Sequence, residues 1–144
     1  MNYYDEIKNE LINNEVTKKV KDYSKNKSDL TTYYNVGKLL AEAGKHYGEG
    51  IIKEYSKRLT NEFGKGYTPT RLRYFRRFYE VLIKHPTVSD KLSYSHYCEL
   101  IWFDIDKINY YIKITEEQNL SVRELRERIK NKEYERLDEE TKNK

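Results

Sequence analysis

The chain has 144 residues, of which 37% are apolar, 36% are charged and 14% are aromatic, and its formal net charge is +4. Its 15 tyrosines supply more aromatic area than a disordered chain carries, so the composition indicates one folded domain. The single cysteine, Cys98, excludes an intramolecular disulfide and a zinc site built on thiolates, and no apolar run is long enough for a transmembrane helix.

The first 50 residues predict two helices. The first covers about Tyr3–Tyr23, and the second begins after Ser28, which is a suitable N-cap residue. Gly37 interrupts the apolar face of the second helix at a cost of about 1 kcal/mol relative to alanine. We therefore expect Gly37 to lie at a close crossing with another helix. The chain start lacks the apolar segment of a signal peptide, so we expect a cytoplasmic protein. In the first helix, apolar residues recur at helical spacing at Tyr4, Ile7, Leu11, Ile12 and Val16.

The stretch from Tyr55 to Tyr79 has the pattern of a helix-turn-helix unit. A helix is predicted over about 51–63, and Gly64 is suited to ending it. Thr68 can cap a second helix whose first residue is Pro69 and which continues to about Ile83. A helix, a short turn and a basic helix are how such proteins present a helix to the major groove of DNA.

Three more helices are expected in the last third of the chain. Ser93 can cap a helix that ends near Phe103, and Asp104 can cap the next one. Ser121 and Glu124 form a capping box for a helix that ends near Asn131. The sequence thus predicts an all-α fold, a single domain of about seven helices over residues 1–137, followed by a charged, disordered tail over 138–144. The inner face of the helix after Asp104 is expected to contain Ile105, Ile108 and Ile112.

A helical wheel divides the basic helix over about 69–83 into two faces. Between Lys45 and Lys84 there are ten basic and four acidic residues, a local net charge of +6, whereas the rest of the chain is slightly acidic. This clustering of positive charge favours binding to phosphate. The apolar face consists of Leu72, Phe75, Phe78, Tyr79 and Leu82. The opposite face consists of Arg73, Arg76, Arg77, Glu80 and Lys84.

These observations predict a DNA-binding, non-catalytic domain that docks this helix in the major groove of double-stranded DNA. Arginine can bond guanine through two hydrogen bonds and binds phosphate equally well. The simpler alternative is a solvated face of an amphipathic helix that binds nothing. The predicted base contacts are Thr70, Arg73 and Arg77. The predicted phosphate contacts are Lys57, Arg58, Lys65, Arg71, Arg76 and Lys84.

Other arrangements of reactive residues give weaker predictions. His96 and Glu99 can share a helix face near Cys98, but a metal site needs further ligands. The tripeptides Glu6-Ile7-Lys8 and Glu140-Thr141-Lys142 resemble part of a nuclease motif, yet neither follows an apolar strand. We therefore expect no enzyme activity, no metal and no cofactor. For Trp102, Tyr97, Tyr110 and Tyr111 we favour packing in the core over an aromatic platform that stacks single-stranded bases.

Several short stretches together resemble a bacterial family over about residues 10 to 137. They are residues 33–38 (YYNVGK), 59–64 (LTNEFG), 71–79 (RLRYFRRFY), 92–97 (LSYSHY) and 120–125 (LSVREL). They look like the N-terminal domain of DUF1016, or YhcG-type, proteins, although tyrosine stands at Tyr34 and Tyr94 where we expect tryptophan. The family joins this domain to a C-terminal nuclease domain of the PD-(D/E)xK class, which has no counterpart in these stretches.

The resemblance implies a DNA-binding or partner-binding role in mobile-element or defence settings. It does not imply nuclease activity for these residues. The alternative to DNA binding is a protein-interaction module, either a homodimer or the partner of a separately encoded nuclease, with the many tyrosines as its contact surface.

Overall fold

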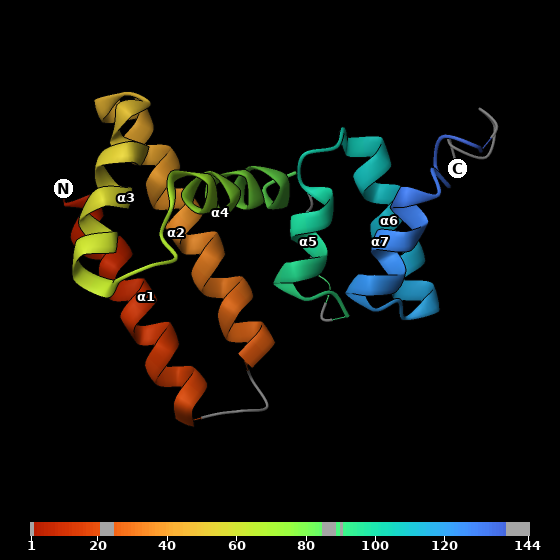
Figure 1. The fold of residues 1–144 in the computed structure, drawn as a ribbon, viewed down its shortest axis with the longest axis horizontal. Helices are drawn as coiled ribbons and strands as arrows, with labels where there is room; N and C mark the ends of the chain where they lie inside the picture. The colour runs from red at the N-terminus through yellow and green to blue at the C-terminus, as the bar shows by residue number, and fades with distance from the viewer. Residues whose placement is uncertain (1, 21–24, 85–88, 90, 138–144) are drawn as a thin grey trace. The chain divides into compact units, whose positions relative to one another are not determined.

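Seven α-helices account for most of the described residues, as the sequence predicts (Figure 1). The computed structural model describes residues 2–20, 25–84, 89 and 91–137, and it has no strand among them. The chain is therefore an all-α domain. Its helices gather into two compact units, residues 1–86 with the first four helices and residues 87–144 with the last three. The helices are α1 (Tyr3–Val20), α2 (Lys25–Tyr47), α3 (Gly50–Phe63), α4 (Pro69–Leu82), α5 (Tyr94–Leu100), α6 (Ile105–Gln118) and α7 (Val122–Lys130).

The helix starts at Thr68, Ser93, Asp104 and Ser121 are confirmed, because each side chain caps its helix. The Thr68 hydroxyl accepts a hydrogen bond from the Arg71 N–H at 3.1 Å. The reciprocal bonds of the Ser121 capping box are 3.1 and 2.9 Å long. Such caps satisfy backbone N–H groups that have no partner within the helix.

The structure differs from two of the predicted helix boundaries. The start of the second helix after Ser28 is wrong, because α2 begins at Lys25. The Ser28 hydroxyl instead donates to the Asn14 side chain on α1. The fifth helix is shorter than predicted and ends at Leu100 rather than near Phe103. The predicted end of the first helix at Tyr23 and the tail over 138–144 lie outside the described residues.

The core of the first unit is built around α2 and α4, the pair of helices with the most extensive contact. The Tyr33 ring of α2 stacks on the Phe75 ring of α4, with 4.7 Å between ring centroids. Burying such side chains contributes about 1.5–3 kcal/mol each. Side chains with no solvent exposure in this unit are Ile7, Val36, Leu40, Ala43, Ile52, Leu59, Leu72, Phe75 and Phe78.

Gly37 lies where α2 crosses α4, as the sequence predicts. A Cβ atom at Gly37 would stand 2.1 Å from the Phe75 carbonyl oxygen and 2.8 Å from the Tyr79 Cβ. Backbone cannot yield as the end of a flexible side chain can, so only glycine permits this distance between the two helices.

The buried stripe of α1 departs from the predicted one. Tyr4, Ile7 and Leu11 are buried, but Ile12 and Val16 are exposed. Asn14 continues the stripe, because its amide donates to Asp29 at 2.9 Å and the bond offsets the cost of burying a polar group. The next buried position of this stripe therefore holds a polar residue with a hydrogen-bond partner, which the spacing of apolar residues alone does not predict.

The second unit packs α5, α6 and α7 around its own core. The predicted inner face of α6 is right at Ile108, but Ile105 is exposed and Ile112 is only half-buried. Ile105 is the first residue of the helix, beside the Asp104 cap, where the chain is still at the surface. The buried residues of α6 are Ile108, Tyr111, Ile114 and Thr115. No helix among the described residues is both long and apolar enough to cross a membrane.

We expect Gly37→Ala to destabilise the fold by about 3 kcal/mol, because the added methyl group meets the Phe75 carbonyl. Gly44→Ala, seven residues further along α2, is the matched control. Its Cβ would be 3.9 Å from the Arg76 guanidinium, so this variant should gain up to about 1 kcal/mol of helix propensity. Urea unfolding followed by circular dichroism measures both. Equal stabilities for the two variants would contradict the crossing.

Candidate nucleic-acid interface

The turn between α3 and α4 is fixed to both helices. It contains two glycines in the left-handed region, Gly64 with φ 88° and Gly66 with φ 113°, where other residues are strained. On the α3 side, the Ser56 hydroxyl donates to the Tyr67 carbonyl at 2.6 Å. On the α4 side, Arg71 Nη1 donates to the Gly66 carbonyl at 2.8 Å. The start of α4 is therefore held in a defined position relative to α3.

The apolar face of α4 agrees with the helical wheel. Leu72, Phe75, Phe78 and Leu82 are buried. Tyr79 is only half-buried, and its ring lies 5.1 Å from that of Tyr34 on α2. Packing on this side leaves the opposite side of α4 facing away from α2.

The opposite side carries a line of polar and basic residues, which we call the α4 outer stripe: Thr70, Arg73, Arg77 and Lys84. Thr70, Arg73 and Lys84 are exposed, and Arg77 is half-buried. Thr70, Arg73 and Arg77 lie within about 60° of one another on the wheel, because each helical residue turns by about 100°, and Lys84 follows the end of the helix. Glu80 is the one acidic residue of α4, and it lies beside this stripe.

Arg76 is predicted to contact phosphate, but its guanidinium is bound to Glu49. Arg76 Nη1 and Nη2 donate to the two Glu49 oxygens at 2.8 and 2.9 Å. Glu49 stands at the N-cap position of α3, yet its side chain makes no cap bond there. Instead it ties the start of α3 to the middle of α4 through a bidentate ion pair. Arg73 lies at the edge of this pair, with its Nε 4.0 Å from Glu49.

Two further arginines that are predicted to contact phosphate, Arg71 and Arg58, contact other groups of the protein. The Arg71 guanidinium bonds the turn and stands 5.1 Å from the Tyr67 ring centroid. The Arg58 guanidinium lies 3.7 Å from the Tyr4 ring centroid, a distance typical of a cation–π contact. For these two and for Arg76, contact with phosphate remains a prediction. For Arg71 and Arg76 it would compete with the hydrogen bonds described.

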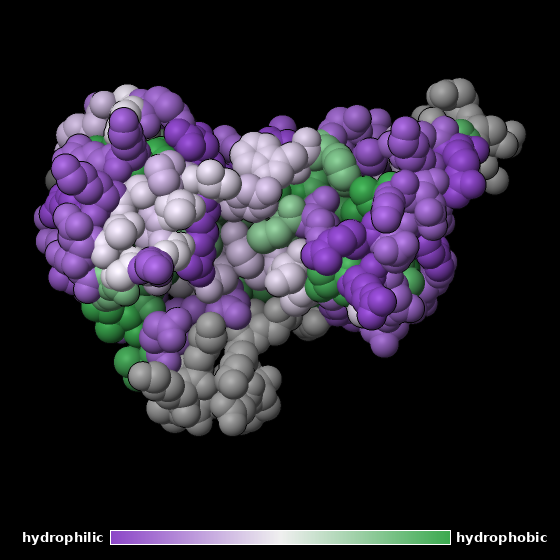
Figure 2. All heavy atoms as spheres, viewed as in Figure 1, coloured by the Kyte–Doolittle hydropathy of each residue, from purple (hydrophilic) through white to green (hydrophobic). Residues whose placement is uncertain are grey.

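The three predicted lysine contacts are placed differently. Lys57 on α3, Lys65 in the turn and Lys84 after α4 are exposed, and none forms an ion pair with an acidic residue in the described part of the chain. Much of the surface over α3 is hydrophilic on the face seen in Figure 2. These lysines can therefore reach a phosphate without breaking a contact within the protein.

The charge of Glu49 is stabilised by its arginine partners. The hydrogen bonds from Arg76 lower the pKa of the Glu49 carboxyl below its ordinary value of 4.5, and the positive charges of Arg76 and Arg73 lower it further. Partial burial acts in the opposite direction, because it disfavours the charged form. Glu49 thus remains an anion at neutral pH beside the α4 outer stripe.

In the alternative metal site that the sequence suggests, His96 and Glu99 both have partners within the protein. His96 is buried, and each of its ring nitrogens makes a hydrogen bond. Nδ1 accepts from the Ser93 N–H at 2.9 Å, and Nε2 donates to the Leu120 carbonyl at 2.8 Å. Glu99 pairs with Arg126 at 2.5 Å. No group of three potential metal ligands occurs among the described residues.

Of the two nuclease-like tripeptides, the first lies among the described residues. In the first, Ile7 is fully buried on α1 and Lys8 pairs with Glu62 of α3 at 3.0 Å. The second, at 140–142, lies outside the described residues.

The predicted core role is right for Tyr97 and Tyr111, which are buried, and wrong for Trp102, which is 52% exposed.

The sequence interpretation missed Glu49, which stands between Gly48 and Gly50 and looks like part of a loop. It also missed His96, which completes a capping box where Glu or Gln is usual. The partners of Glu49 and His96 could not be inferred from neighbouring residues, since Arg76 is 27 residues from Glu49 and Leu120 is 24 residues from His96.

The comparisons with known proteins give one match. A family model described as the DUF1016 N-terminal domain matches residues 7–136, which is most of the chain. No curated protein and no solved structure matches it.

We expect the pKa of Glu49 to rise toward 4.5 in Arg76→Ala, because the largest stabilising contact is removed, and to rise less in Arg73→Ala. The pKa of Glu49 is lower in the folded state than in the unfolded state. The ion pair with Arg76 therefore stabilises the fold at a pH above the unfolded-state pKa. This stabilisation is lost as the pH falls through the folded-state pKa. Because Glu49 is exposed, the contribution should stay below about 1 kcal/mol. A carboxyl titration by NMR measures this. Unchanged titration in Arg76→Ala would contradict it.

Proposed function

We propose that this chain, which belongs to the DUF1016 N-terminal domain family, is a non-catalytic module that binds double-stranded DNA through α4. The observation that carries the proposal is the α4 outer stripe, whose basic residues face away from the core on a helix fixed by a short turn. A helix presented in this way can enter a major groove about 12 Å wide.

The proposed contacts follow from exposure and from existing partners. Thr70 and Arg73 lie in the first half of α4 and are exposed, and Arg77 is one turn further along. In helix-turn-helix proteins this part of the recognition helix meets the base edges. Lys57, Lys65 and Lys84 are suited to phosphates, because they are exposed and have no acidic partner among the described residues.

Arg58, Arg71 and Arg76 have a different role in this proposal. Their guanidiniums hold Tyr4, the turn and Glu49, so they position α3 and α4 for binding. Only a rearrangement would release Arg71 and Arg76 to phosphate, because their N–H groups are hydrogen-bonded. The N–H groups of Arg58 have no hydrogen-bond acceptor among the described residues and stay available above the Tyr4 ring. The number of phosphates neutralised is therefore smaller than the local excess of six positive charges suggests.

The first test removes the two stripe arginines together. We expect Arg73→Ala with Arg77→Ala to weaken binding to a duplex at least about tenfold, and to reduce the slope of log affinity against log salt by up to about two. Fluorescence anisotropy over a salt series measures both quantities. Arg123→Ala with Lys130→Ala removes the same charge from exposed residues of α7 and should leave both nearly unchanged. If the stripe variant behaves like this control, α4 is not the DNA-binding element.

The second test removes the acidic neighbour of the stripe. Glu49→Gln should strengthen duplex binding several-fold at low salt, because it removes a negative charge next to Arg73 while the amide oxygen can still accept a hydrogen bond from Arg76. The gain should shrink as salt is added, since exposed charges are screened. Glu127→Gln removes one exposed carboxylate from α7 and is the matched control. Anisotropy at two salt concentrations measures the difference. No gain over the control would argue against DNA lying near Glu49.

A protein-interaction or dimerisation module is the second candidate, and a different observation favours it. Trp102 is 52% exposed and Ile105 is 37% exposed, on either side of the Asp104 cap. Exposed tryptophans often dominate the affinity of protein interfaces. The tyrosines give less support, because Tyr47 alone among those described is exposed. A partner nuclease or a second copy of the chain would use such a surface. Sedimentation with and without duplex DNA separates the candidates, since a tight dimer that ignores DNA favours this one.

A further inference from the structure

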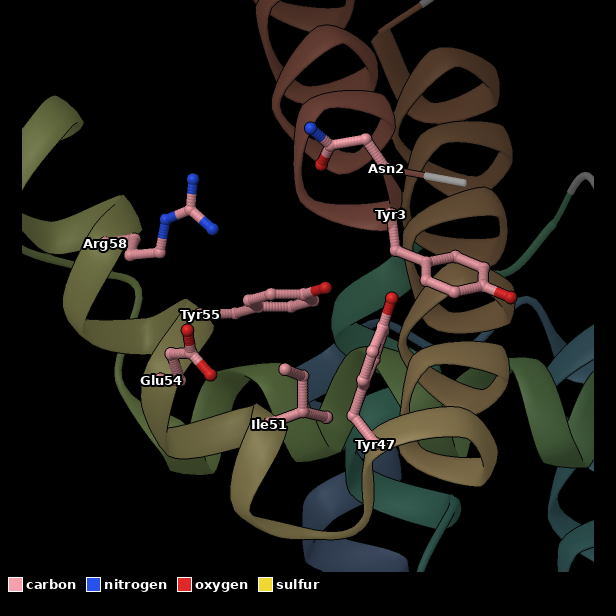
Figure 3. Close-up of a pocket in the computed structure, with 7 residues that line it drawn as sticks. All are labelled: Asn2, Tyr3, Tyr47, Ile51, Glu54, Tyr55 and Arg58. Atoms are coloured by element: carbon pink, nitrogen blue, oxygen red, sulfur yellow. The ribbon is translucent and has the colours of Figure 1, made fainter.

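A pocket of about 500 Å³ opens on the first unit, on surfaces that the proposed duplex contact does not use (Figure 3). It lies among the start of α1, the end of α2 and one face of α3. Its volume is within the range of about 300–1,000 Å³ found for small-molecule sites. The lining residues are Asn2, Tyr3, Tyr47, Ile51, Glu54, Tyr55 and Arg58.

Aromatic side chains form much of the pocket wall. Tyr55 extends from α3 toward Tyr47 of α2, and the Tyr47 and Tyr3 rings meet in a T-shaped contact at 6.3 Å (Figure 3). Tyr55 is only 5% exposed, whereas Tyr47 is 58% exposed. The exposed Tyr47 ring offers an apolar surface on which a planar group can stack.

The polar groups of the pocket are mainly unused hydrogen-bond donors. Among the described residues, none makes a hydrogen bond with the Tyr47 or Tyr55 hydroxyl or with the Arg58 guanidinium, which stands over the Tyr4 ring. Burial raises the pKa of Tyr55, so its hydroxyl keeps its proton at neutral pH. Asn2 contributes less, because its side chain bonds Asp5 at the start of α1. Donors beside a positive charge fit an anionic group rich in acceptors.

The pocket also holds one acceptor, the Glu54 carboxylate. Glu54 and Arg58 are one turn apart on α3, but no ion pair joins them, and Glu54 has no such partner among the described residues. A carboxylate can accept a hydrogen bond from the exocyclic amine of cytosine. It also disfavours an anion placed directly against it. A ligand that fits all three features has a planar ring with an amino group at one end and a phosphate at the other.

We infer that this pocket binds an unpaired nucleotide of a single-stranded DNA segment, with its base against Tyr47, its amino group toward Glu54 and its phosphate on Arg58. Single-stranded nucleic acids are held in this way, by aromatic stacking combined with a positively charged group. The inference goes beyond duplex binding by α4 and does not rest on it. Together the two sites would favour DNA in which a duplex adjoins an unpaired strand.

The test uses labelled single-stranded deoxycytidine and thymidine oligonucleotides of about 12 nucleotides, a length that covers one site. In fluorescence anisotropy, the intact chain should bind deoxycytidine more tightly, because thymine lacks an exocyclic amine. Tyr47→Ala should weaken binding at least about fivefold, since it removes the stacking surface. Tyr47→Trp should retain it. Glu54→Ala should remove the preference for deoxycytidine.

Two controls make each outcome decisive. Trp102→Ala removes an aromatic ring of similar exposure outside the pocket and should not change single-strand binding. Arg73→Ala with Arg77→Ala should weaken duplex binding while single-strand binding persists, so the two proposals can fail separately. The inference is overturned if the intact chain does not bind the single strands, if Tyr47→Ala matches Trp102→Ala, or if the α4 variant loses single-strand binding as Tyr47→Ala does. Circular dichroism confirms that the variants fold.

Discussion

The contact between the backbones of α2 and α4 at Gly37 is the constraint on which the first unit depends. Because Gly37 has no side chain, α2 approaches the Phe75 carbonyl more closely than any other residue would allow. The large side chains of α4 then fill the space on either side of this crossing, and Leu72, Phe75 and Phe78 lose all exposure. With the apolar face fixed, the rotation of α4 about its axis is fixed too. The residues opposite the crossing must therefore face away from α2, and these residues form the α4 outer stripe.

Positive charge in this region is divided between the fold and its surface. Arg58, Arg71 and Arg76 stack on a ring, bond the turn and bind Glu49, while Lys57, Lys65 and Lys84 face solvent. Arginine suits the first task, since its planar group can stack and form two parallel hydrogen bonds. Lysine carries a compact, well-hydrated charge on a flexible stem and needs no fixed partner. A count of basic residues therefore overstates the positive charge available to a ligand. In this region these three lysines are available, whereas the three arginines contact other groups of the protein.

Much of the fold was predictable because its signals are local. A helix cap or a glycine in a turn depends on a few neighbouring residues, so Thr68, Asp104 and the Ser121 capping box were recognised correctly. The errors occur where a distant partner decides. Asn14 is buried with Asp29 and Ser28 as its hydrogen-bond partners, whereas Ile12 and Val16, which the apolar spacing predicts to lie in the core, are exposed. Similarly, Glu49 looks like a loop residue until Arg76 is placed beside it, and the tyrosine pocket joins residues from three helices.

The sequence by itself determined the all-α class, most helix starts, the two faces of α4 and the family, because these depend on local spacing and on motifs that persist along the chain. Only the tertiary structure decided which arginines are engaged within the protein, which tyrosine is exposed, and where unpaired donors meet in a pocket. The physical reason is that a charge or a hydroxyl acts according to the groups within a few ångströms of it. Those groups come from helices that are far apart in the sequence and are brought together only when the helices of the first unit pack against one another.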